Sequence, residues 1–173
     1  MTSAELIGDA FGRIREAVHG AVEDLTTDDL ALRIDDRANS IAWLVWHLTR
    51  IQDDHVAHVA GTDQVWTSSG WATRFDLPFD IADTGYGHDA EQVGAVRTDA
   101  QMLLAYYDAV AEATARFVRQ VTDADLDRVV DERFDPPVTL GVRLVSVIAD
   151  DLQHAGQAAY VRGILERKGA GAK

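Results

Sequence analysis

The sequence predicts an all-α protein, a four-helix bundle with a long aromatic loop between the second and third helices. Three observations favour this fold class. Apolar residues recur every three or four positions over four long segments. Residues that commonly cap helix N-termini stand just before these segments. Strict alternation of polar and apolar residues, which is typical of half-buried strands, is scarce.

The first helix is predicted to begin near the N-terminus. Thr2 and Glu5 have the spacing of a capping box, in which each side chain binds the other residue's backbone N–H group. The apolar residues that follow are spaced as on one helix face: Ile7, Phe11, Ile14 and Val18. We expect this helix to end near Gly20 or to continue to Leu25.

The second helix is predicted to run to Ala60, because Gly61 is a natural helix terminator. Asn39 or Ser40 can cap its N-terminus. Its apolar residues keep the helical period: Trp43, Leu44, Leu48 and Ile51. His47 interrupts this run, which is the most hydrophobic of the sequence.

Residues 61–88 are predicted to form an irregular segment, because glycines and a proline interrupt a series of aromatic residues. Loops of this length are uncommon in compact domains unless they build or cover a site. The segment could therefore act as a lid or pocket wall, and simple packing over the end of the bundle explains it equally well. Its candidate substrate contacts are Trp66, Trp71, Arg74 and His88.

The third helix is predicted to begin at Asp89, which has capping-box spacing with Gln92. It should continue through the strongest helical pattern of the chain: Val93, Val96, Ala100, Leu103, Tyr107, Val110, Ala113, Phe117 and Val121. Residues 135–137, Asp-Pro-Pro, break the pattern. Thr139 can cap the last helix, which we expect to reach about Arg167.

We predict a single domain over residues 1–167 and a flexible tail over residues 168–173. The sequence has no cysteine, so any thiol chemistry must come from a small-molecule co-substrate. No apolar run is long enough to span a bilayer, and the N-terminus lacks the basic and apolar regions of a signal peptide. We therefore expect a cytoplasmic protein.

The formal net charge of −13 argues against a nucleic-acid partner. DNA-binding proteins rely on cationic side chains that replace phosphate counterions, and the sequence has no cluster of lysines and arginines. The same charge disfavours binding to anionic membranes. We expect neither a nucleic acid nor a membrane as partner.

Asp150 and His154 are the strongest candidates for a functional site, because residues four apart lie one above the other on a helix face. The same stripe holds Val147, Gln157 and Val161, and the adjoining surface is apolar: Val145, Ile148, Leu152, Ala155 and Ala159. A carboxylate and an imidazole suit a divalent metal, for which His47 could be a third ligand from a neighbouring helix. On spacing alone, a hydrogen-bonded or solvated Asp–His pair is the more frequent arrangement.

Two segments resemble the signature regions of the DinB-like superfamily: residues 39–48, Asn-Ser-Ile-Ala-Trp-Leu-Val-Trp-His-Leu, and residues 154–157, His-Ala-Gly-Gln. Over nearly its whole length the chain is similar to the branch that includes mycothiol-dependent maleylpyruvate isomerase and related thiol transferases. The resemblance implies a four-helix bundle, commonly dimeric, with a metal held by His47, Asp150 and His154. At position 150 many members carry histidine and the isomerase branch carries glutamate, which the aspartate here shortens by one methylene.

The resemblance implies a metal-dependent transferase or isomerase that activates a low-molecular-weight thiol such as mycothiol. Zinc is the expected metal, although two histidines and a carboxylate also suit nickel, iron and manganese. Gln157 and Asp54 are expected to orient a ligand or substrate, and Trp43 shares the helix stripe of His47. The expected partners are a small thiol, an electrophilic substrate and a second copy of the chain.

Two other functions remain open at this point. A metal-dependent hydrolase on the same site would use bound water in place of the thiol. A non-catalytic dimeric binding or stress protein would retain only a vestigial site. Thiol-dependent turnover would distinguish the thiol transferase or isomerase from the hydrolase. Metal content would distinguish both enzymes from the non-catalytic protein.

Overall fold

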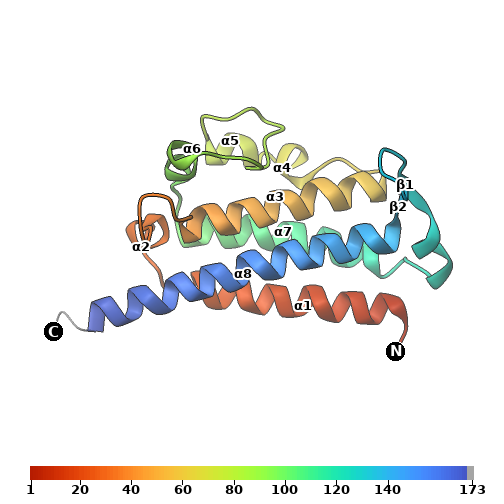
Figure 1. The fold of residues 1–173 in the computed structure, drawn as a ribbon, viewed down its shortest axis with the longest axis horizontal. Coiled ribbons are helices and arrows are strands. Elements are labelled where there is room, and N and C mark those ends of the chain that lie inside the picture. The colour runs from red at the N-terminus through yellow and green to blue at the C-terminus, as the bar shows by residue number, and fades with distance from the viewer. Residues whose placement is uncertain (171–173) are drawn as a thin grey trace.

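The computed structural model describes residues 1–170, of which residues 168–170 are described by their backbone alone. Four long helices form a bundle in which α1 and α8 run in one direction and α3 and α7 in the other, and each of α1 and α3 packs against both α7 and α8 (Figure 1). Their bounds are α1 Ser3–Val22, α3 Ile41–Ala60, α7 Ala100–Val118 and α8 Leu140–Ala170. The predicted four-helix bundle is therefore confirmed.

The helix ends follow the predicted capping chemistry. Thr2 and Glu5 form the capping box at the start of α1. Ser40, not Asn39, caps α3, because its hydroxyl accepts a hydrogen bond from the backbone N–H of Trp43. Gly61 ends α3 in the left-handed conformation, with φ of +68°.

Short elements connect the bundle helices. A five-residue helix, α2 (Thr27–Ala31), follows α1, and its capping box was not predicted. Two more short helices lie inside residues 61–88, which we call the aromatic segment: α4 (Val65–Ser68) and α5 (Trp71–Phe75). A 3-10 turn and a small antiparallel hairpin precede α8: η1 (Asp123–Asp127), β1 (Val129–Asp131) and β2 (Val138–Thr139).

The prediction of one continuous helix from Asp89 onward is wrong. The chain forms α6 (Ala90–Ala95), leaves the helical conformation at Val96 and re-enters a helix at Ala100. Asp99 explains the second start, because its carboxylate accepts a hydrogen bond from the backbone N–H of Met102. The apolar period continues across the break because Val93 and Val96 are both buried in the core.

The last helix buries one face and exposes another. Val147, Ala155, Ala158 and Val161 lie in the core, whereas Val145 and Leu152 of the adjoining apolar surface are exposed. The helix continues to Ala170, three residues beyond the predicted end, and residues 171–173 of the expected tail lie outside the described part of the chain. Within residues 1–170, no helix combines the length and hydropathy that a bilayer-spanning segment requires.

Candidate metal centre

Three side chains converge where α3 packs against α8: His47 from α3, and Asp150 and His154 from α8. Each offers one ligand atom, and these atoms all lie within 4.8 Å of one another. Ligand atoms bound at roughly 2.0–2.2 Å to one cation lie at most about 4.4 Å apart. Small side-chain rotations would therefore bring all three to a common ion.

Both histidines present the same ring nitrogen to this cluster. The Nδ1 of His47 donates a hydrogen bond to the backbone carbonyl of Thr84. The Nδ1 of His154 lies 3.0 Å from the side-chain oxygen of Gln157. Because both acceptors are carbonyl oxygens, each Nδ1 carries the hydrogen and each Nε2 keeps its lone pair for a metal.

Asp150 supplies an unsatisfied acceptor. Its Oδ1 lies 3.7 Å from Nε2 of His154, and its buried Oδ2 has no hydrogen-bond partner among the described residues. A buried carboxylate oxygen without a partner is costly, and a cation would satisfy it. The donor set of two imidazoles and one carboxylate thus fits a divalent transition metal.

The cluster opens toward solvent on the α8 side. His47 is 6 % exposed, whereas the side chains of His154 and Asp150 are 18 % and 34 % exposed. Burial lowers the pKa of His47 below its ordinary value of 6.5, so the neutral imidazole that a metal requires predominates at neutral pH. A small molecule could reach the cluster past Asp150 and His154.

Trp43 of α3 and residues 84–85 of the aromatic segment form the opposite wall. The indole of Trp43 stacks on the His47 ring with a centroid separation of 4.6 Å and an interplanar angle of 11°. Gly85 has φ of +89°, and a Cβ at this position would lie 2.9 Å from Nδ1 of His47. The close approach therefore requires glycine. Thr84 and Gly85 were missed in the sequence because they contribute main-chain atoms, which leave no side-chain pattern.

Two predicted contact residues lie beside the ligands. Gln157 contacts His154, as described above. His88 is only 3 % exposed; its Nδ1 accepts a hydrogen bond from Nε1 of Trp43, and its Nε2 donates one to Asp83. The structure thus places His88 behind Trp43 rather than on an open surface.

The remaining predicted contacts hold the aromatic segment together. Trp66 and Trp71 are buried against Tyr106, and the guanidinium of Arg74 lies 4.6 Å from the Trp71 ring centre. Asp54 accepts a hydrogen bond from the side-chain amide of Gln64, the residue that precedes α4. These contacts agree with packing over the bundle, the simpler of the two interpretations of this segment.

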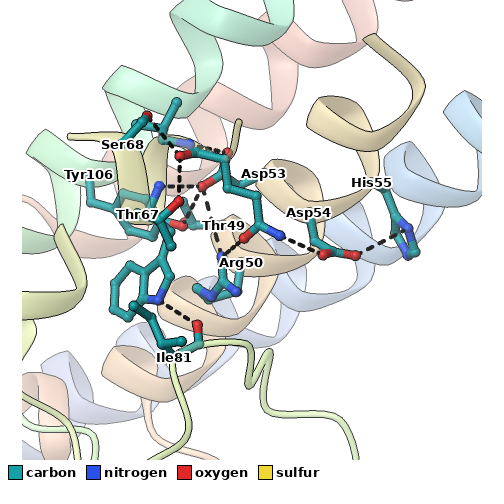
Figure 2. Close-up of polar contacts among 12 residues, drawn as sticks. Thr49, Arg50, Asp53, Asp54, His55, Thr67, Ser68, Ile81 and Tyr106 are labelled. Carbon is teal, nitrogen blue, oxygen red and sulfur yellow. Dashed lines mark hydrogen bonds and ion pairs between the residues drawn. The ribbon is translucent and has the colours of Figure 1, made fainter. Parts of the chain in front are cut away.

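Asp53 anchors the segment to α3, as Figure 2 shows. Its carboxylate accepts hydrogen bonds from the backbone N–H groups of Val65 and Trp66 and from the hydroxyl of Tyr106. Burial raises the pKa of Asp53 above its ordinary value, against these hydrogen bonds and the nearby charge of Arg50. The base of α4 is therefore fixed to the helix that carries His47.

Comparisons with known proteins identify the family and the fold. A family model described as mycothiol-S-transferase matches residues 7–167. A solved structure described as the conserved protein of locus from Enterococcus faecalis is 30% identical, with a TM-score of 0.86. The match covers 94% of this chain and 96% of that chain. A search of curated proteins finds no significant match.

Proposed function

The chain belongs to the mycothiol-S-transferase family, and on this basis we propose that it is a metal-dependent transferase of a low-molecular-weight thiol. The observation that carries the metal part of the proposal is the convergence of His47, Asp150 and His154, together with an oxygen of Asp150 that has no hydrogen-bond partner within residues 1–170. Zinc is the proposed metal because it favours this donor set and leaves room for a further ligand.

The residues around the cluster would have two roles, metal binding and orientation of the histidine rings. His47, Asp150 and His154 would hold the cation, while Thr84 and Gln157 keep the two imidazole rings oriented. A bound divalent metal lowers the pKa of a thiol and favours the nucleophilic thiolate at neutral pH.

The surroundings of the cluster indicate where substrates would enter. One face of the His47 ring is covered by the Trp43 indole of α3, and Thr84 and Gly85 of the aromatic segment lie against its Nδ1, so substrates would enter past the more exposed Asp150 and His154. The thiolate sulfur would then donate an electron pair to an electrophilic carbon of the second substrate, forming a C–S bond while the bond from that carbon to its leaving group breaks. The leaving group would depart with the bonding electron pair and take up the proton that the thiol has lost. Because the chain has no cysteine, that sulfur must belong to a small molecule.

The experiment that tests this function combines metal analysis with a thiol-dependent assay. We expect protein purified without chelator to carry about one equivalent of zinc or another transition metal, and His154→Ala to lose it. Turnover of electrophiles should require added mycothiol or a related thiol. Turnover without thiol would instead indicate a hydrolase, and absence of metal after incubation with zinc, nickel and manganese would favour a non-catalytic binding protein.

We also propose that a second copy of the chain binds along α8. The exposed residues of this helix between positions 142 and 160 are all uncharged: Val142, Val145, Ser146, Ala149, Leu152, Gln153, Gly156, Gln157, Ala159 and Tyr160. In a chain with net charge −13, repulsion between two copies is weakest where both present uncharged surfaces. The apolar members of this face supply area that pairing would remove from water.

A further inference from the structure

A directed series of hydrogen bonds runs behind the His47 ring. The indole Nε1 of Trp43 lies 3.1 Å from Nδ1 of His88, and Nε2 of His88 lies 3.0 Å from Oδ2 of Asp83. An indole N–H can only donate, so Nδ1 of His88 must accept and Nε2 must carry the hydrogen. The direction of both bonds is therefore fixed, and Asp83 is the final acceptor.

The two ends of this hydrogen-bond series, Trp43 and Asp83, lie on different sides of the His47 ring. On one side, the Trp43 indole that donates to His88 is the ring on which the His47 imidazole stacks. On the other side, the second carboxylate oxygen of Asp83 accepts a hydrogen bond of 2.7 Å from the backbone N–H of Gly85. This bond spans Thr84, whose carbonyl accepts the hydrogen of His47 Nδ1.

The segment itself is tied to a rigid part of the molecule. The backbone carbonyl of Asp83 accepts a hydrogen bond of 3.1 Å from Nε of Arg50, a fully buried residue of α3. The absence of a side chain at Gly85 lets the backbone lie directly against His47 and Trp46. Residues 83–88 and the α3 turn that carries His47 therefore form one packed unit.

We propose that Asp83 and His88 are positioning residues for His47. They fix the plane of the Trp43 ring and the place of the Thr84 carbonyl, and so direct Nε2 of His47 toward Asp150 and His154. The inference rests on the metal-dependent function proposed above. Outer hydrogen-bond partners of metal-bound histidines commonly change metal affinity 10- to 100-fold, which is roughly the effect we expect here.

Two variants break the series, one of them, Asp83→Asn, without a change in shape. Asp83→Asn leaves one oxygen for two donors, Gly85 and His88, so either orientation of the amide sets a donor against a donor. Trp43→Phe keeps an aromatic ring on His47 but removes the indole N–H. The matched control is Asp108→Asn, which alters the 2.9 Å contact between His19 and Asp108. Both of these residues lie outside the packed unit.

Two readouts separate positioning from general stability. Nitrogen NMR of the imidazole rings in metal-free protein reports the tautomer of His47. We expect wild type and Asp108→Asn to show hydrogen on Nδ1, and Asp83→Asn and Trp43→Phe to show a mixture of tautomers. Competition with a chromophoric chelator gives the Kd for zinc, which should rise roughly 10- to 100-fold in these two variants alone.

The outcomes distinguish this inference from the proposed function. An unchanged His47 tautomer in both folded variants overturns the positioning role, as does an unchanged Kd in a protein that binds zinc. If the wild type binds no zinc and its His47 tautomer still depends on Asp83, the metal-dependent function fails and the positioning role stands.

Discussion

Asp150 and Asp151 are neighbours in sequence and lie in opposite environments. Asp150 is part of the metal-ligand cluster, whereas Asp151 is fully buried and neither of its carboxylate oxygens has a hydrogen-bond partner among the described residues. Burial, and then the charge of Asp150, raises the pKa of Asp151 well above its ordinary value. The core of the bundle thus contains a carboxyl group that opposes folding.

Replacing Asp151 with leucine should stabilise the metal-free protein at neutral pH. Leucine has a similar shape and removes an unsatisfied buried group, whose cost is typically about 1–3 kcal/mol. We expect the free energy of unfolding to rise by about that amount, measured by urea denaturation. Asp151→Asn, which keeps two polar atoms in the core, should gain less. A loss of stability in Asp151→Leu would show that the carboxyl group has a favourable partner.

The metal ligands should be replaceable without loss of the fold. We expect His47→Ala, Asp150→Ala and His154→Ala to abolish metal binding and to keep the helical far-UV circular dichroism spectrum, because the bundle core lies mostly on other residues. Asp150→Glu keeps a carboxylate and should retain metal. Wild-type metal content in all three alanine variants would refute the ligand assignment, and unfolding would indicate a structural role.

Gly85 and Gly87 offer a matched pair of substitutions. Both have positive φ, +89° and +78°, so alanine strains either backbone by about 1 kcal/mol or more. A Cβ at position 85 would meet His47 and Trp46 within 3 Å, whereas a Cβ at position 87 would have no atom of the described part of the chain within 4 Å. We expect Gly85→Ala to weaken zinc binding and Gly87→Ala to leave it unchanged in a titration. Equal zinc affinities in the two variants would contradict the close approach at His47.

His19 should make stability depend on pH. Partial burial opposes its protonation, but hydrogen bonds and charges from Asp108 and Glu23 outweigh it and raise the pKa of His19 above 6.5. The folded protein therefore binds this proton more tightly than the unfolded chain. Its contribution to stability is complete below pH 6.5 and is lost as the pH rises through the folded-state pKa.

The substitution His19→Gln isolates this effect. We expect the difference in unfolding free energy between wild type and variant to be larger at about pH 6 than at about pH 8.5. Urea denaturation at the two pH values provides the measurement. A difference that is the same at both values, or larger at the higher one, would refute the assigned ion pairs.

A charge on the exposed face of α8 should prevent pairing of two copies. Val145 is 63% exposed, so aspartate there should leave the bundle folded while adding like charges to a shared interface. We expect light scattering at micromolar concentration to give a dimer for wild type and a monomer for Val145→Asp. Ile81→Asp, at an exposed position of the aromatic segment, serves as the control. A monomeric wild type would exclude the proposed pairing.

Much of the fold was predictable because capping and helical periodicity act locally. Thr2, Ser40 and Gly61 mark helix ends through interactions with their own neighbours. The break after α6 was not predictable from the sequence. Val93 and Val96 remain buried, so the apolar period continues through the non-helical residues. Apolar spacing alone did not separate one long helix from two that share a core.

The candidate site was predictable to a similar degree. Helical spacing and the family resemblance pointed to His47, Asp150 and His154, and the structure brings these side chains together. The part of the opposite wall that the aromatic segment contributes was not predictable, because it consists of a main-chain carbonyl and a glycine whose positions depend on tertiary packing. Likewise, no local rule distinguishes which of two adjacent aspartates enters the core.

The hydrogen bond from His47 to the Thr84 carbonyl has a consequence for how this site can diverge. The Thr84 carbonyl belongs to the main chain and is present whatever the side chain at this position. A substitution of Thr84 therefore cannot directly remove the hydrogen bond to Nδ1 of His47. Surface loops ordinarily tolerate insertions and deletions, yet one added residue between Asp83 and His88 would move the carbonyl away from Nδ1. Relatives that share this arrangement should therefore conserve the length of the segment more strictly than its side chains.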